Sequence, residues 1–354
     1  MFNSNSKQQT KNFSVSLLKQ PTFLNLMKKK IALVTGGYSG EAVISYKSAL
    51  SIEKNIDSDK WDHYTIDINL TGWFYLAKDG TRIAVDKNDF SITIDGNKII
   101  FDGVLVALHG TPGEDGKLQG YFDCLKMPYS SCDAATSALT FNKRYTVAVA
   151  AFAGIHVAKS MHLFKHLKTS PAEILEQLKL PVFVKPNNGG SSIGMSKVKE
   201  AAELEEALAK AFKEDEQVLV EEFIKGREFT IGVFKSKGKI ITLPITEIIP
   251  KKEFFDYEAK YEGASDEITP ANVDENIAQQ VRDEANKAYS IFNCNGIVRM
   301  DYIYDEAVGR PCLLEINTVP GQSEASIVPQ QVRAMGWTLM EFYSALIEEC
   351  FSEK

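Results

Sequence analysis

The sequence lacks a long apolar run, a paired-cysteine motif and an excess of positive charge, and each absence excludes a class of protein. No apolar run reaches the ~20 residues that a helix needs to cross a bilayer. The five cysteines form no CxxC pair, so neither a zinc site nor a disulfide framework is indicated. The formal net charge of −7 argues against binding to nucleic acid, which requires clustered lysine and arginine. We therefore expect a cytoplasmic protein that binds neither nucleic acid nor membrane.

The composition is that of a globular protein with two or three domains. The 354 residues are 44% hydrophobic and 25% charged, which allows a sizeable buried core. Residues 1–27 are polar and lack the apolar stretch of a secretory signal, so we predict a disordered extension. For the rest of the chain, we predict domains over 28–128, 129–219 and 220–354.

Residues 299–321 place one cation, two carboxylates and a carboxamide on two adjacent β-prone runs. A polar stretch with a glycine separates the runs, which predicts an antiparallel hairpin. Because strand side chains alternate, Arg299 and Asp301 share one face of the first strand. Glu315 and Asn317 likewise share one face of the second strand. This donor set suits Mg²⁺ that also holds substrate phosphates; the alternative is an ordinary hairpin with solvated acidic side chains.

Strand-like and helix-like runs alternate in the first part of the chain, which predicts an α/β domain with a parallel sheet. A helix-rich region around one short strand follows, and the remainder is richer in strands. The expected strands are 31–35, 99–107, 181–185, 217–220, 229–234, 297–304 and 311–316, and the expected helices are 41–55 and 201–213. Residues 251–270 lack apolar periodicity and are predicted to form a long functional loop.

Two glycine-rich turns follow predicted strands. The first, residues 36–40, is a candidate anion site because helix N-terminal amides point outward and glycine lets a ligand approach. It lacks the full GxGxxG of a dinucleotide site, and Glu41 at the helix start would repel a pyrophosphate. The second turn, 186–194, follows Lys185, whose charge can hold a phosphate while backbone amides wrap the rest. The alternative for this loop is a flexible turn.

With these motifs in order, the chain resembles the D-alanine–D-alanine ligases of the ATP-grasp superfamily from about residue 28 onward. The resemblance rests on GGYSGE at 36–41, LHGTPGEDG at 108–116, VKPNNGGSSIGMSKV at 184–198, EEFIKGREFT at 221–230, YEAKY at 257–261 and LLEINTVPG at 313–321. It implies an α/β (α+β) fold with a three-domain ATP-grasp architecture, in which a Rossmann-like parallel-sheet domain comes first. It also implies a homodimer.

The resemblance implies a nucleotide and metal site. It implies that the ATP phosphates contact Lys143 and Lys185, that the adenine contacts Glu221, Glu222 and Ile224, and that the ribose contacts Glu228. The residues implied to bind two Mg²⁺ or Mn²⁺ ions that bridge the phosphates are Asp301, Glu315 and Asn317.

The implied reaction joins two D-alanine molecules for peptidoglycan precursor synthesis. The carboxylate of the first attacks the γ-phosphate of ATP, and the amine of the second attacks the resulting acyl phosphate. Glu41 would bind the first ammonium group with His109 nearby, although a lone histidine beside glycine is equally typical of a structural role. Arg299 and the backbone N–H of Gly321 would stabilise the oxyanion.

The remaining implied roles concern the second substrate and loop closure. Ser326 and Ile327 would hold the second carboxylate, and Ser191 and Tyr261 would link with Glu41 to close the loops over the site. Tyr261 favours the dipeptide product, because relatives that make a D-lactate ester carry a histidine there. A ligase for D-lactate or D-serine is the alternative within this fold. The second alternative is a non-catalytic nucleotide-binding protein, although the intact set of metal ligands and cations argues against it.

Overall fold

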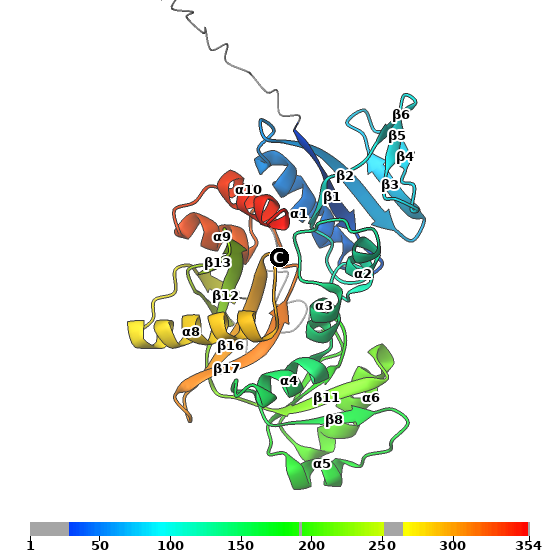
Figure 1. Ribbon diagram of the computed structural model, residues 1–354. Coiled ribbons are helices and arrows are strands. Elements are labelled where there is room, and N and C mark those ends of the chain that lie inside the picture. Colours follow the sequence, from blue (N-terminus) through cyan, green and yellow to red (C-terminus); the bar gives the residue numbers. More distant parts are fainter. Residues whose placement is uncertain (1–27, 191–192, 251–264, 353–354) are drawn as a thin grey trace, which may run out of the picture.

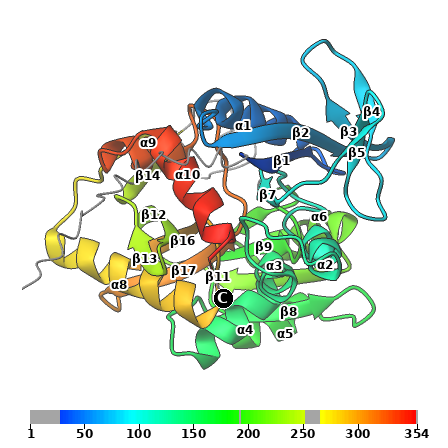
Figure 2. The same ribbon diagram turned by 45° about the horizontal axis from the view of Figure 1, so that its top comes forward.

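The computed structural model describes residues 28–190, 193–250 and 265–352. The prediction for residues 1–27 therefore lies outside the described residues. The described chain contains three larger sheets with flanking helices and one two-stranded sheet. Figures 1 and 2 show the larger ones, called here the N-terminal, central and C-terminal sheets. None of the described helices combines the length and apolar character needed to span a bilayer.

The N-terminal sheet has the order β4-β3-β2-β1-β7, and β1 runs parallel to both β2 and β7. Its strands are β1 (Lys29–Gly36), β2 (Trp61–Asn69), β3 (Gly72–Leu76), β4 (Arg82–Ala84) and β7 (Gly103–Val106). The helices of this part are α1 (Ala42–Asn55) and α2 (Lys117–Cys124). The predicted parallel sheet is confirmed. The single strand expected over 99–107 is wrong, because β6 (Asn97–Ile99) pairs with β5 (Ile92–Ile94) in a separate hairpin.

The central sheet is antiparallel, with the order β10-β9-β11-β8. Its elements are β8 (Ser160–Phe164), α5 (Pro171–Gln177), β9 (Val182–Pro186), β10 (Ser196–Val198), α6 (Leu204–Glu214) and β11 (Gln217–Glu222). The expectation of one short strand among helices was wrong, since β8 and β10 complete a sheet. The predicted domain boundary at 219/220 falls inside β11, so we propose to place it in the connection 223–225.

The C-terminal sheet has the order β15-β14-β12-β16-β17, with β13 also paired to β12. Its strands are β12 (Gly226–Ser236), β13 (Lys239–Thr242), β14 (Thr246–Pro250), β15 (Ser265–Ile268), β16 (Val298–Asp305) and β17 (Arg310–Asn317). The helices around it are α3 (Ala134–Phe141), α4 (Lys143–Phe152), α8 (Glu275–Ile291), α9 (Ile327–Ala334) and α10 (Leu339–Cys350). The loop expected over 251–270 therefore contains β15, and residues 251–264 lie outside the described part of the chain.

One hydrophobic core joins the N-terminal and C-terminal parts. Ile31 and Leu33 of β1 and Ile52 of α1 pack in the same buried cluster as Phe342 and Tyr343 of α10. This shared core fixes the loops that follow β1 and β7 relative to the end of β17. The cavity described next lies between those loops.

Candidate active site

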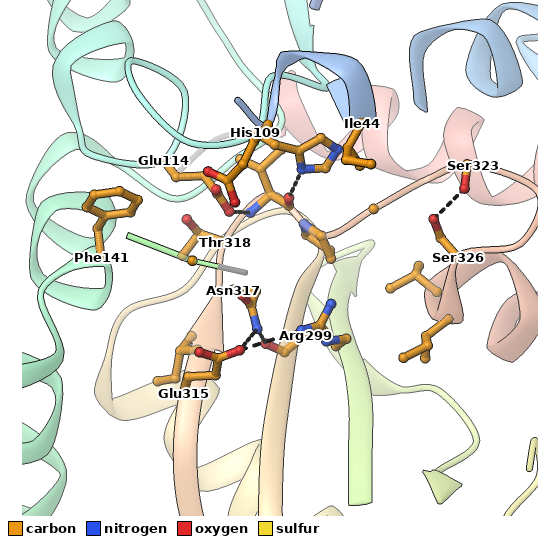
Figure 3. A pocket seen from close by; sticks show the side chains of 18 of the residues that line it. Ile44, His109, Glu114, Phe141, Arg299, Glu315, Asn317, Thr318, Ser323 and Ser326 are labelled. Atoms are coloured by element: carbon orange, nitrogen blue, oxygen red, sulfur yellow. Dashed lines mark hydrogen bonds and ion pairs between the residues drawn. The ribbon is translucent and has the colours of Figure 1, made fainter. Parts of the chain in front are cut away.

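A cavity of about 360 Å³ lies where the three sheets meet. It is lined by the start of α1, the loop after β7, the junction of α3 with α4, the glycines after β9 and the segment after β17 (Figure 3). The predicted site residues that line it are Glu41, His109, Lys143, Arg299, Glu315, Asn317, Gly321, Ser326 and Ile327. Ser191 and Tyr261 lie outside the described residues.

The predicted hairpin of β16 and β17 is confirmed, with strand ends close to those expected. The register pairs Arg299 with Asn317 and Asp301 with Glu315, followed by a bulge after Asp301. The four polar side chains therefore gather on one face. Asp301 is only 8% exposed, so the alternative of solvated acidic side chains does not apply to it.

Arg299 lies between the two carboxylates of this hairpin. Its Nε and Nη2 donate to the Asp301 carboxylate at 2.9 and 2.7 Å, and Nη2 is 3.8 Å from Oε1 of Glu315. Burial opposes the charge of the guanidinium, but Asp301 and Glu315 outweigh it and raise the pKa of Arg299 above its ordinary value. The hairpin thus concentrates negative charge that needs a cation.

The donor set fits a hard divalent cation. Two carboxylates and a carboxamide offer oxygen ligands, and the carboxylates are already arranged about a positive group. The Nδ2 atom of Asn317 is 3.3 Å from Oδ2 of Asp301 and 3.4 Å from Oε1 of Glu315. Figure 3 shows Asn317 beside Glu315. A half-turn of this amide would bring its oxygen to face a metal instead. Asp301, Glu315 and Asn317 are therefore the residues that would hold the metal.

Glu41 stands at the N-terminus of α1, where the helix dipole favours a carboxylate. Its backbone carbonyl accepts from the N–H groups of Ile44 and Ser45, so the residue is fixed by the first helical turn. An added Cβ atom at Gly190 would lie 2.8 Å from Oε1 of Glu41, so the glutamate side chain would have to move. The loop after β9 thus approaches Glu41 closely.

Glu114 is a site residue that sequence reasoning missed. Its carboxylate accepts from the N–H of Gly110 at 2.6 Å and from that of Val319 at 3.3 Å. Burial, with the nearby charge of Glu41, raises the pKa of Glu114 to about 8. The only signal in the sequence is its position between two glycines in the motif that contains His109, because its partner at Val319 is distant in the chain.

His109 lines the cavity, but both of its ring nitrogens have partners in the protein. Nδ1 lies 2.7 Å from the carbonyl of Val319, and Nε2 lies 2.9 Å from Oγ of Ser48. A carbonyl only accepts, so Nδ1 carries the proton and Nε2 accepts from the serine. Burial lowers the pKa of His109 to about 4, which keeps the ring neutral. This geometry supports the structural role, in which His109 positions the loop after β17.

That loop leads into the N-terminus of α9. Ser326 is the N-cap residue of α9 and Ile327 is its first helical residue, and both line the cavity. Oγ of Ser326 lies 2.7 Å from Oγ of Ser323, and a Cβ atom at Gly321 would lie 2.8 Å from Oγ of Ser326. A hydroxyl at a helix start is suited to a carboxylate.

The residues implied to bind ATP differ in whether they line the cavity. Lys143 lines the cavity and its Nζ donates to the carbonyl of Gly189 at 2.6 Å. Lys185 forms an ion pair with Glu221 of the neighbouring strand, and both side chains are largely buried. Burial and the charge of Glu221 raise the pKa of Cys312 in β17 to about 12, so this pair lies close to the C-terminal sheet.

Of the six residues implied to bind ATP, Lys143 lines the cavity and the other five do not. Oε1 of Glu222 accepts from the N–H of Lys179 at 2.9 Å, which directs its side chain away from the Glu221 face. Ile224 lies in the connection between β11 and β12, and Glu228 pairs with Ile248 in the C-terminal sheet. The residues implied to bind ATP therefore lie along the junction of the central and C-terminal sheets.

Solved structures of known proteins share this arrangement. A D-Ala:D-Ser ligase, VanG, from Enterococcus faecalis has a TM-score of 0.82 and 30% identity, covering 91% of this chain and 99% of that one. A Bacillus anthracis D-alanine–D-alanine ligase complexed with ATP has a TM-score of 0.73 and 27% identity, covering 91% and 97%. The fold and the site define an enzyme of the ATP-grasp class.

Sequence comparison narrows this class to one family. The D-ala D-ala ligase N-terminus model matches residues 30–132, and the C-terminus model matches 141–348. The D-alanine–D-alanine ligase of Parabacteroides distasonis is 46% identical over 323 residues, covering 91% of this chain and 98% of the relative. That of Flavobacterium johnsoniae is 44% identical over 320 residues, covering 90% and 98%. The chain belongs to the D-alanine–D-alanine ligase family.

Proposed function

We propose that this protein joins two D-alanine molecules into D-alanyl-D-alanine, with ATP converted to ADP and phosphate, for peptidoglycan precursor synthesis. The observation that carries the proposal is the position of Arg299, which lines the cavity and contacts both Asp301 and Glu315. The same cavity is lined by Glu41 and by the N-terminus of α9, which suit an ammonium group and a carboxylate.

The first step activates a carboxylate, because a carboxylate carbonyl resists nucleophiles. A carboxylate oxygen of the first D-alanine attacks the γ-phosphorus, and ADP leaves with the electrons of the broken P–O bond. Lys143 and Lys185 would bind the phosphates, and Glu41 would hold the ammonium group of the amino acid. Mg²⁺ or Mn²⁺ held by Asp301, Glu315 and Asn317 would neutralise the developing phosphate charge.

The second step forms the peptide bond. The amine of the second D-alanine attacks the acyl phosphate carbonyl to form the C–N bond. Phosphate then leaves with the electrons of the broken C–O bond, and the proton of the attacking nitrogen passes to water or to the departing phosphate. Arg299 and the N–H of Gly321 would bind the oxyanion, and loss of one such donor typically costs about 3 kcal/mol of transition-state stabilisation. Ser326 and the N–H of Ile327 would hold the second carboxylate.

A second candidate is a ligase that takes D-serine as its second substrate. The structural likeness to a D-Ala:D-Ser ligase, at a TM-score of 0.82, is the observation in its favour. D-alanine as the second substrate is supported by the relatives with greater sequence identity, which are named D-alanine–D-alanine ligases. Tyr261, on which the sequence argument against D-lactate rests, lies outside the described residues.

The deciding assay is ATP-dependent phosphate release with D-alanine alone, followed by competition with D-serine or D-lactate and identification of products by mass. We expect D-alanyl-D-alanine as the main product. Absence of phosphate release with D-alanine and Mg²⁺ would overturn the proposal, and a mixed product would favour the second candidate.

The metal requirement is tested by Glu315→Gln. This change keeps the shape of the side chain but removes one charge from the ligand set, so metal-dependent turnover should fall by about 10-fold or more. The matched control is Glu306→Gln, an exposed position in the turn between the same two strands. Wild-type turnover in Glu315→Gln at limiting Mg²⁺ would contradict its role as a ligand.

We also propose that the enzyme works in the cytoplasm as a homodimer. ATP as a substrate requires a compartment that contains it, and the dimer follows from the family resemblance. Light scattering coupled to size-exclusion chromatography tests the dimer, and a monomeric mass would refute it.

A further inference from the structure

Thr230 lies beside the predicted metal ligand Asp301, and the reaction described above gives Thr230 no role. It sits on β12, directly across from Asp301 on β16 in the antiparallel register. Only 1% of Thr230 is exposed, so its hydroxyl group must find its partner inside the protein. That partner is Asp301, because Oγ1 of Thr230 donates to Oδ1 of the carboxylate.

The two oxygens of Asp301 are held from opposite sides. β16 lies between β12 and β17 in the sheet. Oδ1 is bound by Thr230 from the β12 side, whereas Oδ2 lies 3.3 Å from Nδ2 of Asn317 on the β17 side. Oδ2 is therefore the oxygen turned toward Glu315 and Asn317, the other predicted ligands.

Thr230 and Arg299 hold Asp301 in different ways. The guanidinium is a cation, so it competes with a metal ion for the same carboxylate. The threonine hydroxyl is neutral, and its bond to Oδ1 is compatible with a cation on Oδ2. A carboxylate oriented by such a partner loses less rotamer freedom when it binds a metal.

Thr230 is itself fixed by a buried glutamine on α9. Nε2 of Gln331 donates to the carbonyl of Thr230 at 3.0 Å, and Oε1 of Gln331 accepts from the N–H of Gly232 at 3.0 Å. Gln331 is fully buried. The backbone that carries the Thr230 hydroxyl is thus held at the carbonyl of Thr230 and at the N–H of Gly232.

We propose that Thr230 is a positioning residue that orients Asp301 for the divalent metal and thereby sets metal affinity. This inference rests on the proposed metal-dependent function. It assigns Thr230 no contact with substrate or metal, since its hydroxyl acts through the carboxylate alone.

The test measures Mn²⁺ affinity directly. The EPR signal of free Mn²⁺ is followed during titration of the full-length protein with the non-hydrolysable analogue AMP-PNP present. Thr230→Val keeps the side-chain shape and removes the hydroxyl, so we expect affinity to fall by about 10-fold or more, as for other partners of metal ligands. Thr230→Ser keeps the hydroxyl and should restore most of the wild-type affinity.

The matched control is Thr65→Val on strand β2 of the N-terminal sheet. Thr65 is also buried, and its hydroxyl donates to the carboxylate of Glu53 on α1, which is not a predicted metal ligand. We expect a loss of stability with wild-type Mn²⁺ affinity. If Thr230→Val does not fold, Thr230→Ala compared with Thr230→Ser makes the same distinction.

The outcomes separate this inference from the function on which it rests. Wild-type Mn²⁺ affinity in Thr230→Val, equal weakening in Thr65→Val, or failure of Thr230→Ser to recover would each overturn the role of Thr230. Absence of Mn²⁺ binding by the wild-type protein with AMP-PNP would instead overturn the metal-dependent function itself.

Discussion

At the scale of single residues, His109 and Glu114 respond to pH in opposite directions. The pKa of His109 falls from 6.5 to about 4 on folding, so the unfolded chain binds the extra proton between these values. The pKa of Glu114 rises from 4.5 to about 8, so the folded protein keeps the proton that the unfolded chain releases. Stability is therefore lost at low pH through His109 and at high pH through Glu114.

Glu114→Gln should remove the loss of stability at high pH. Glutamine cannot ionise, so the free energy of unfolding of the variant, relative to wild type, should increase as pH rises from 4.5 to 8. Urea unfolding at several pH values measures this difference. Glu176→Gln, at an exposed position on α5, is the control and should give a constant difference. A constant difference for Glu114→Gln would contradict the raised pKa.

His109→Asn should remove the loss of stability at low pH. Between pH 6.5 and 4, wild-type protein loses stability because only the unfolded state protonates this ring, whereas the variant has no such loss. The stability difference between wild type and variant should thus shrink as pH falls. The exposed His166→Asn serves as the control in the same urea titrations. A difference that grows on acidification would show that the ring is protonated in the folded protein.

At the scale of elements, Gln331 ties helix α9 to two strands of the C-terminal sheet. Its amide bonds to backbone groups of Thr230 and Gly232 on β12 and to the hydroxyl of Thr246 on β14. Removing a buried partner leaves the others unsatisfied, at about 1–3 kcal/mol for each group.

We therefore expect Gln331→Leu to lower the free energy of unfolding by about 3 kcal/mol or more, because three groups lose a partner. The neighbouring Gln330→Leu is the control, because Gln330 bonds on the protein surface to Glu267 and Ala325. Urea unfolding at one pH compares the two variants. Equal losses would mean that the buried bonds of Gln331 contribute nothing beyond ordinary packing.

The strands that carry the hairpin could be predicted from the sequence, because alternation and a glycine-containing turn are local signals. The shared faces of Arg299 with Asp301 and of Glu315 with Asn317 followed from the same alternation, whereas the register that pairs Asp301 with Glu315 comes from the structure. In contrast, β10 has only three residues and β8 lies at a sheet edge, so neither shows a clear period. Both strands were missed because their pairing with β9 and β11 is a tertiary effect.

The site residues divide in the same way. Glu41, Arg299 and Glu315 could be found from motifs, because each stands at a recognisable strand or helix end. Glu114 and Thr230 could not, because their roles depend on Val319 and Asp301, which are far away in the sequence. The ion pair of Lys185 with Glu221 also arises only when β9 and β11 pair.

At the scale of the whole molecule, α10 holds the N-terminal sheet to the C-terminal sheet. Phe342 is fully buried, and its ring meets that of Phe234 on β12 at 5.2 Å between centroids. The same cluster includes Ile31, Leu33 and Ile52 of the N-terminal part. Changes in α10 should therefore affect both parts of the molecule together.

Phe342→Ala should lower the free energy of unfolding by about 3–5 kcal/mol, the usual cost of a large cavity. Met340→Ala, at a position 46% exposed on the same helix, is the control. Differential scanning calorimetry should show one transition that moves to lower temperature. A second, unshifted transition would show that one part of the molecule unfolds independently of α10.

This shared core has a consequence for how the protein is made. During translation, β1 and α1 leave the ribosome early, but the aromatic side chains that cover them belong to α10, which is synthesised more than 280 residues later. The nascent chain must therefore carry an incompletely covered apolar face for most of its synthesis. Chaperones that bind exposed apolar segments would engage this face until α10 emerges.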